Sequence, residues 1–342
     1  AQNGVLIKNA EALEMMNKVD TLIVDKTGTL TEGKPTVERI GVFKTGADRS
    51  EQEVLRYVSS LNQLSEHPLA AATVAYGKEQ NAALVEVGNF SAIAGKGVEG
   101  VVGGKKAALG NAGMMQREGA ELTDAMVREV QPFQEQGKTI SYLALDGVVA
   151  GFVVISDKIK RSSQRAVSAL QEKGIEVIML TGDNPETARA VSGELGLNGF
   201  HAGMLPEGKM REVERLQAEG RIVAMAGDGI NDAPALAKSD VGIAMGTGTD
   251  VAIESASITL VKGDLRGIVR ARNLSEAVMR NIRQNLFFAM IYNTLGVPIA
   301  AGVLYPVFGL LLSPMIAALA MSFSSVSVIA NALRLRTQKI DD

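Results

Sequence analysis

The stretch that decides the fold is VDTLIVDKTGTLTEGKP, residues 19–35. An apolar, β-branched run ends in one aspartate, Asp25, and a turn of small residues follows it. An apolar run bounded by such a breaker is typical of a buried parallel strand that ends in a loop. The sequence therefore predicts a lone carboxylate at the carboxyl end of a buried strand.

Two later stretches have the same form, EVIMLTGDN (176–184) and RIVAMAGDGIND (221–232). The chain between them has the helical spacing of NPETARAVSGELGL and of PEGKMREVERLQAEG. Strands that alternate with helices predict an α/β fold with a doubly wound parallel sheet. Ligands bind at the carboxyl ends of the strands in such sheets, so Asp25, Thr181 and Asp228 are expected at one binding edge.

Composition excludes several classes of site and partner. The 342 residues suffice for two or more domains, and the net charge of −3 gives no electrostatic reason to expect nucleic acid binding. Cysteine is absent and only two histidines occur. Disulfides and a cysteine- or histidine-built metal site are therefore not expected within these residues.

Residues 34–152 interrupt the alternation of strands and helices. They contain the helical stretch SEHPLAAATVAYGKE, glycine-rich hairpin-like pieces, and two strands around the Asp-Gly turn at 146–147. We expect an inserted α+β domain here, and a sheet domain built from residues 19–33 and 153–264.

The C-terminal part has a different character, because residues 284–333 contain no Asp, Glu, Lys or Arg. This length allows two membrane-crossing helices, preceded by an amphipathic lead-in helix at 265–283 and followed by a cytosolic tail at 334–342. Arg283 and Arg334 lie at the two ends of the stretch, so both ends are expected in the cytosol. The alternative is a buried helical hairpin in a soluble protein.

The chemistry at Asp25 follows from its charge. A carboxylate is ionised at neutral pH and can attack phosphorus without a base to deprotonate it. Repulsion between the two anions is the obstacle, and a divalent cation with positive or amide-rich surroundings removes it.

The other strand ends offer the remaining parts of a phosphoryl-transfer site. The Thr181 hydroxyl and the Gly182 N–H can bind phosphate oxygens, and Lys209 is a point charge suited to phosphate. Asp228 and Asp232 are hard oxygen ligands for Mg²⁺. Each part alone is weak, since Gly-Asp after a strand is more often a turn, but the ordered set is specific.

The motifs DKTGTLT, TGDN and GDGINDAPAL together resemble the P-type cation-transporting ATPases, which have the haloacid-dehalogenase-like fold, and the resemblance covers essentially the whole chain. It implies that ATP phosphorylates Asp25, with Mg²⁺ held by Asp25, the Thr27 carbonyl and Asp228. The residues so implied for the catalytic and magnesium sites are Asp25, Lys26, Thr27, Thr181, Gly182, Asp183, Lys209, Asp228 and Asp232. Related phosphatases usually carry a second aspartate where Thr27 stands. Because threonine exchanges no proton near pH 7, the phosphoenzyme is expected to persist.

SEHP (65–68) resembles the signature of the heavy-metal subgroup, so residues 34–152 are expected to bind nucleotide. A neutral imidazole can stack on a purine or hydrogen-bond it, and glycines let the backbone approach phosphates. Asn62 stands where the family often has glutamate. The nucleotide positions implied are Glu66, His67, Gly95, Gly97, Gly110 and Asn111.

The polar residues of the uncharged stretch resemble the copper-specific branch, in the spacings N-x6-YN-x4-P and M-x2-SS. A thioether is a soft ligand that favours Cu(I), and silver(I) fits equally. For the serines, packing between helices is the alternative explanation. The implied Cu(I) ligands are Tyr292, Asn293, Met321, Ser324 and Ser325.

The family's Cys-Pro-Cys helix and actuator domain are not found in this sequence, and residues 1–18 resemble the segment that follows an earlier membrane helix. The leading hypothesis is ATP-driven Cu(I) export by a multi-pass protein, in a bacterial plasma membrane with its catalytic domains in the cytosol. Its expected partners are the lipid bilayer, ATP, Cu(I) and the N-terminal half, without which this chain should not pump. The rivals are a membrane-anchored phosphatase and an inactive regulator that binds nucleotide or copper.

Overall fold

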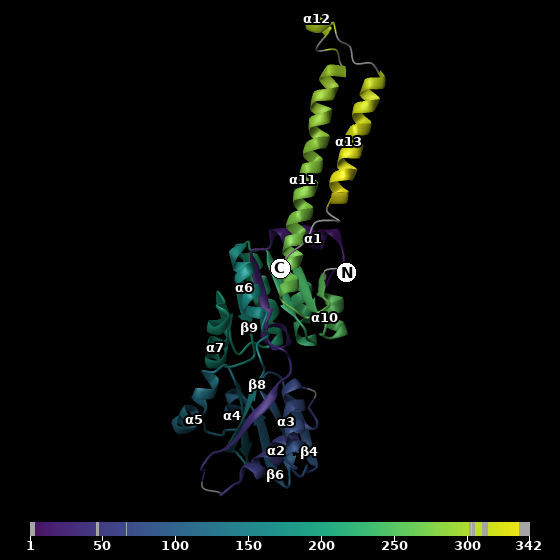
Figure 1. The fold of residues 1–342 in the computed structure, drawn as a ribbon. Helices are drawn as coiled ribbons and strands as arrows, with labels where there is room; N and C mark the ends of the chain where they lie inside the picture. The colour runs from purple at the N-terminus through teal and green to yellow at the C-terminus, as the bar shows by residue number, and fades with distance from the viewer. Residues whose placement is uncertain are drawn as a thin grey trace.

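The computed structural model describes residues 4–45, 48–65, 67–300, 302, 305–309 and 314–334. It has two β-sheets and a pair of long C-terminal helices (Figure 1). The second sheet lies at one end of the molecule and the helical pair extends from the other, with the first sheet between them.

The first sheet is the predicted parallel sheet. Its strands are parallel except for the first, which is antiparallel to its neighbour. All five residues of the strand that ends in Asp25 are buried. In spatial order the strands are β1 (Val5–Ile7), β13 (Ile258–Leu260), β12 (Val241–Met245), β11 (Val223–Gly227), β2 (Thr21–Asp25), β9 (Glu176–Leu180) and β10 (Gly199–His201).

Helices cover both faces of this sheet, because the central strands are apolar on both sides. Leu22 and Val24 pack in one core cluster and Ile23 in the other, as the alternation of side chains along a strand requires. The first cluster is closed by α1 (Ala10–Lys18), α6 (Ser163–Glu172) and α7 (Pro185–Leu195). The second is closed by α8 (Pro206–Ala218), α9 (Ala233–Lys238) and α10 (Asp250–Ser255).

The second sheet is antiparallel and arises between β2 and α6 in the chain. Asp146 and Gly147 join β7 to β8 with φ angles of 48° and 79°, the left-handed pair of a type I′ hairpin turn, as the sequence predicted. In spatial order its strands are β3 (Thr36–Val42), β8 (Val148–Ser156), β7 (Thr139–Leu145), β6 (Lys105–Gly110), β5 (Gly97–Val102) and β4 (Val87–Ile93). With α2 (Glu51–Asn62), α3 (Pro68–Glu79), α4 (Ala112–Arg117) and α5 (Asp124–Gln134), it forms what we call the inserted body.

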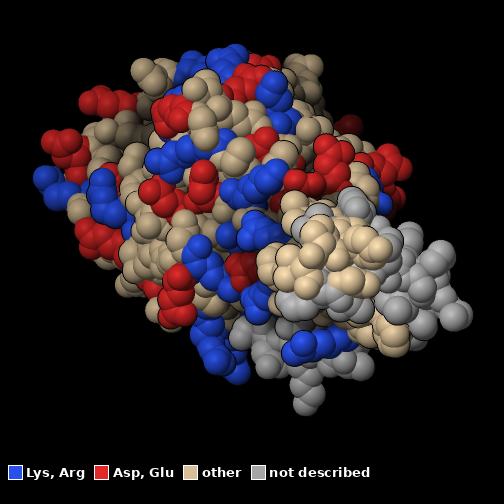
Figure 2. All heavy atoms as spheres, turned by 90° about the horizontal axis from the view of Figure 1, so that it is seen from above, with Lys and Arg blue, Asp and Glu red and all other residues tan. Residues whose placement is uncertain are grey.

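The long helices are α11 (Arg266–Ala300) and α13 (Pro314–Arg334), with the short α12 (Tyr305–Phe308) between them. The expected lead-in helix and the first helix of the hairpin are one continuous helix, α11. Its first turns are buried against α1 and α6, and its distal part runs beside α13. Figure 2, seen from above, shows Lys and Arg side chains close to the helical pair. Arg280 and Arg283 on α11 are exposed just before the uncharged stretch begins.

Within the described ranges, no helix is both long enough and apolar enough to span a membrane. The stretch predicted to hold two membrane helices, residues 284–333, includes positions outside those ranges. The first described segments, β1 and α1, are part of the domain built on the first sheet. Strand β1 pairs with β13, and α1 packs on α11.

Candidate active site

Three carboxylates meet at the carboxyl edge of the first sheet. Asp25 ends β2, Asp228 follows β11, and Asp232 ends the short 3₁₀ turn after it. One carboxylate oxygen from each residue lies within 4.8 Å of those from the other two. The meeting follows from the parallel pairing of β2 with β11, which places both strand ends at the same edge. We call Asp25, Asp228 and Asp232 the carboxylate cluster.

Lys209 provides the positive charge at this cluster. Its ammonium group, on the first turns of α8, donates to Asp25 Oδ1 at 2.5 Å and to Asp232 Oδ1 at 2.7 Å. Burial alone would lower the pKa of Lys209, but the charges of Asp25 and Asp232 outweigh it and hold that pKa above its usual value. Asp232 is positioned by its other oxygen, which accepts the N–H groups of Asp228 and Gly229 at 3.3 and 3.2 Å.

One ammonium group does not balance three carboxylates. Burial, and next the charge of Asp232, raises the pKa of Asp25 from 3.8 to about 7. The same two causes raise the pKa of Asp228 to about 6. A dense set of hard oxygen ligands with excess negative charge is suited to a divalent cation such as Mg²⁺.

The loop after β2, residues 26–31, is pressed against the cluster; we call it the Asp25 loop. Gly28 has a φ of 74°, and a Cβ there would lie 1.7 Å from Asp228 Oδ2, so only glycine fits. Within the described part of the chain, the buried Thr29 hydroxyl has no hydrogen-bond partner. An unpaired buried hydroxyl on this loop is suited to bond a phosphate oxygen. Thr27, also on this loop, is half-buried.

The TGDN turn lies at the end of the neighbouring strand β9. The Thr181 hydroxyl accepts the Asp183 N–H at 3.1 Å, and Gly182 lies between them. Lys26 forms a buried ion pair with Asp183, and Thr139 of β7 donates its hydroxyl to the other Asp183 oxygen at 3.0 Å. The sequence analysis missed Thr139, because nothing local to that residue shows where it points.

Four of the six nucleotide positions gather on the inserted body. Gly97 and Gly110 face each other across β5 and β6, and a Cβ on either would lie 2.1 Å from backbone oxygen. Asn111 donates to Gly95 O at 2.8 Å and caps α4 through its side-chain oxygen. The close approach of β5 and β6 thus requires glycine at positions 97 and 110 independently of any nucleotide.

His67 caps the start of α3, where its Nδ1 accepts the Leu69 N–H at 3.2 Å. This contact leaves Nε2 as the protonated donor. Desolvation lowers the pKa of His67 although the charge of Asp183 raises it, so the ring is neutral at pH 7. Asn62 is buried and donates to Thr73 Oγ1 at 2.5 Å, which gives it a role inside the fold. Glu66 lies outside the described residues.

The inserted body contacts the first sheet next to the cluster. Besides Thr139 and Asp183, the Thr187 hydroxyl donates to Lys138 O at 2.8 Å. Leu205 lies so close to Gly95 that a Cβ there would be 2.0 Å from Leu205 Cδ2. Gly95 therefore permits this contact, which no motif in the sequence indicated.

The expected copper ligands lie on the two long helices. Tyr292 on α11 is 38% exposed, and on α13 Ser324 is half-buried and Ser325 exposed. The side chains of Asn293 and Met321 lie outside the described set.

Amide groups join α11 and α13. Asn281 donates to Asn331 O at 2.7 Å, and Asn331 donates to Asn285 Oδ1 at 2.9 Å. The sequence analysis gave Asn281 and Asn331 no role, although each is one of the few polar residues at this contact.

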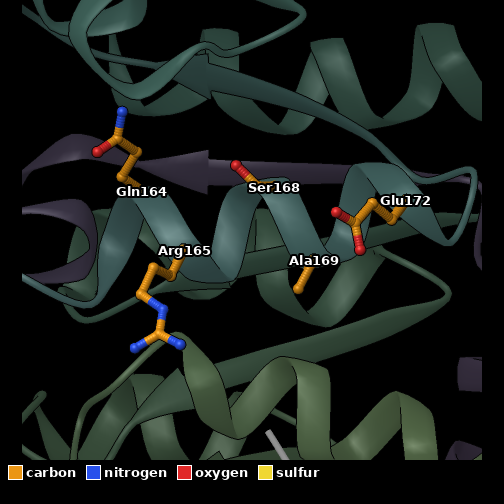
Figure 3. Close-up of a pocket in the computed structure, with 5 residues that line it drawn as sticks. All are labelled: Gln164, Arg165, Ser168, Ala169 and Glu172. Atoms are coloured by element: carbon orange, nitrogen blue, oxygen red, sulfur yellow. The ribbon is translucent and has the colours of Figure 1, made fainter.

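A separate hollow of about 300 Å³ lies along α6 (Figure 3). Its five lining residues all come from this one helix, and none belongs to the predicted site. They are Gln164, Arg165, Ser168, Ala169 and Glu172.

Comparison with known proteins gives the family. The haloacid dehalogenase-like hydrolase family matches residues 19–240. The chain is 57% identical over 341 residues to a copper-transporting P-type ATPase of Rhizobium leguminosarum bv. viciae, covering 99% of this chain and 40% of that protein. It is 55% identical over 340 residues to a silver exporting P-type ATPase of Salmonella typhimurium, covering 99% of this chain and 41% of the relative. The chain thus spans about two fifths of the length of these curated relatives.

Solved structures agree with this assignment. A zinc-transporting PIB-type ATPase in the E2.Pi state superposes with a TM-score of 0.67 at 37% identity, over 98% of this chain and 52% of that one. The catalytic domain of the CPx-ATPase CopB-B gives 0.64 at 32% identity, over 79% of this chain and 96% of that domain. The chain therefore belongs to the haloacid dehalogenase-like hydrolase family and, within it, to the P-type ATPases.

Proposed function

We propose that this chain is the catalytic portion of an ATP-driven exporter of copper(I) or silver(I), and that it acts through an aspartyl phosphate on Asp25. The observation that carries the proposal is the place of Asp25: a buried carboxylate at a strand end, held by Lys209 beside two further carboxylates. The names of the copper and silver relatives supply the cargo.

The reaction at Asp25 is a transfer of one phosphoryl group. An Asp25 oxygen attacks the γ-phosphorus of ATP, the bond from that phosphorus to the bridging oxygen breaks, and ADP leaves with the bridging oxygen. Water later attacks the acyl phosphate, which releases inorganic phosphate and restores the carboxylate. Thr27 cannot serve as the proton acceptor for that water, so the intermediate persists until another part of the protein assists.

The cluster and its neighbours fit Mg²⁺, with Asp25, the Thr27 carbonyl and Asp228 as ligands and Asp232 beside them. When bound, Mg²⁺ offsets the negative charge of the phosphate and of the carboxylates. Lys209 orients Asp25, and its charge opposes the burial that raises the pKa of Asp25. Lys26 forms an ion pair with Asp183, which also accepts a hydrogen bond from Thr139 of the inserted body. Thr181 and Gly182 offer donors to the phosphoryl oxygens.

Nucleotide binding is assigned to residues 34–152, with His67 at the adenine and Glu66, Gly95, Gly97, Gly110 and Asn111 around it. The neutral ring of His67 supports this assignment.

The uncharged stretch 284–333 is proposed to enter the lipid bilayer beside the N-terminal half of the complete pump. That half would supply the actuator domain and the Cys-Pro-Cys helix, with the catalytic domains in the cytosol. The lack of charge in the stretch and its basic flanks support the proposal. Tyr292, Asn293, Met321, Ser324 and Ser325 would contact the transported ion.

Acid-stable labelling from γ-³²P-ATP with Mg²⁺ tests the site directly. We expect label on the wild-type chain, its release by hydroxylamine, and no label on Asp25→Asn. Asp124→Asn is the matched control, because Asp124 is exposed on α5, and it should label like wild type. Equal labelling of Asp25→Asn and wild type would refute the assignment of the nucleophile.

A further inference from the structure

Lys160 lies where three parts of the chain meet, and the chemistry at Asp25 does not use it. It follows β8 and precedes α6. Its ammonium group donates to Gly28 O at 2.6 Å and to Gly263 O at 2.8 Å. Gly28 belongs to the Asp25 loop, and Gly263 lies three residues before the start of α11 at Arg266. One side chain therefore joins the loop that follows the nucleophile to the segment just before the long helix.

The Asp25 loop is held by the segment around Lys160 through the backbone as well. The Lys160 N–H donates to Leu30 O at 3.0 Å, and the Ser163 hydroxyl donates to the same oxygen at 2.9 Å. Thr31 Oγ1 lies 2.5 Å from Asp157 Oδ2. Because these contacts hold both ends of the segment, a shift of the loop must displace Lys160 or break its bonds.

The other end of the connection is equally well anchored. Asp264 accepts the Arg266 N–H at 2.9 Å and so caps the first turn of α11. Arg272, within α11, donates to Met16 O at 2.6 Å and to Val19 O at 3.1 Å. Ile268 is fully buried in the core of the first sheet. A helix fixed in this way moves as a rigid element, so a displacement at Gly263 is passed along α11.

The charges around Lys160 make the connection sensitive to the state of the site. The carboxylates that act on its ammonium group are Asp228, Asp264, Asp157 and Glu32. Asp228 belongs to the carboxylate cluster, and the other three do not. A change of charge at the cluster therefore changes the electrostatic force on the Lys160 ammonium group. That force influences how strongly Lys160 bonds to Gly28 O and to Gly263 O.

We propose that Lys160 is a positioning residue that transmits the state of the Asp25 loop to the base of α11. This inference rests on the proposed function, in that phosphorylation of Asp25 is the event transmitted. Lys160 contacts neither the nucleophile nor the cluster oxygens through any bond described above, so its role is separate from that of Lys209.

Amide hydrogen exchange of the 342-residue chain tests the connection. The variants are Lys160→Met, Lys160→Arg and the control Lys158→Met, whose side chain is exposed two positions away. Without ligand, loss of a charge-assisted hydrogen bond should raise exchange at the start of α11 about tenfold in Lys160→Met. Lys158→Met should exchange like wild type, and Lys160→Arg should restore most of the protection.

Mg²⁺ with beryllium fluoride, which mimics a phosphoryl group on a carboxylate, is then added. We expect exchange to change at the Asp25 loop in every variant, and at the start of α11 in all except Lys160→Met. A wild-type response at the start of α11 in Lys160→Met would overturn the proposal. If wild type does not respond at the Asp25 loop, the proposed function fails, whereas the ligand-free comparison still decides whether Lys160 holds α11. If Lys160→Met does not fold, Lys160→Gln replaces it in both measurements.

Discussion

Two stretches of this chain, β2 and the distal part of α11, are alike in their apolar sequence and lie in opposite surroundings. Every residue of β2 is buried, whereas Leu286 and Phe287 on α11 are 61% and 60% exposed. Strand β2 has a strand on each side and helices on both faces, but distal α11 packs on one neighbouring helix. An apolar run shows that burying the segment away from water is favourable. Which elements bury it depends on what packs around it in the fold.

The two regions also treat polar groups differently. At the end of β2, the buried carboxylates of Asp25 and Asp232 share an ion pair with the ammonium group of Lys209. Where α11 meets α13, neutral amides of Asn281, Asn285 and Asn331 bond to one another. Buried charges cost more than buried amides unless they are paired, so their retention beside Asp25 marks that edge as the functional one.

The largest expected effect is a difference in unfolding free energy between a substitution in β2 and one in the distal part of α11. Ile23→Ala removes fully buried methyl groups from β2 and should lower the free energy of unfolding by about 3 kcal/mol. Leu286→Ala removes a side chain of similar size that is mostly exposed, and should change it by less than about 0.5 kcal/mol. Urea unfolding of both variants measures the difference. Equal losses of unfolding free energy in the two variants would show that Leu286 is buried in solution. The contrast drawn between β2 and the distal part of α11 would then be wrong.

Much of the first sheet and its site could be predicted from the sequence for a physical reason. A strand buried on both faces must be apolar throughout, so its polar end is conspicuous, and parallel pairing brings such ends together. Asp25 ends β2 and Asp228 follows β11, and the two meet at one edge together with Asp232 from the turn after β11.

Contacts between distant segments could not be predicted, because neither partner has a local signature. Thr139 and Asp183 are 44 positions apart and belong to different sheets. Lys160 is one of several lysines in its neighbourhood, and its sequence does not show that it reaches Gly28 and Gly263. Asn62 shows the opposite error. The resemblance places it where the family often has glutamate, but its side chain bonds to Thr73 inside the fold.

A smaller effect is expected from the charge buried at the end of β2. The pKa of Asp25 is raised from 3.8 to about 7 in the folded chain, so the folded state binds the proton more tightly than the unfolded state does. Stability from this group is therefore present at low pH and is lost as pH rises from about 4 to about 7. Asparagine does not titrate, so Asp25→Asn should gain stability over wild type through that window, reaching on the order of 2 kcal/mol above it.

Chemical unfolding from pH 5 to 8 in the presence of a metal chelator measures this gain. Asp124→Asn on the exposed surface is the control and should follow wild type at every pH. A constant difference between Asp25→Asn and wild type would mean that Asp25 is ionised throughout, and that Lys209 balances the end of β2 completely. Added Mg²⁺ should reduce the gain, because a cation at the cluster stabilises the ionised wild type.

The smallest effect is expected at His67, which lies on the inserted body away from both stretches. Its ring caps α3 through Nδ1, so alanine would remove a cap together with any contact to nucleotide. Asparagine also caps helices well but has no aromatic ring. His67→Asn should therefore keep the melting temperature of wild type and weaken ATP binding about tenfold, or about 1.4 kcal/mol. Calorimetric titration with ATP measures this, with GTP as a second ligand. If ATP binds His67→Asn as tightly as wild type, the imidazole serves α3 alone, and the adenine must be held by other groups of the inserted body.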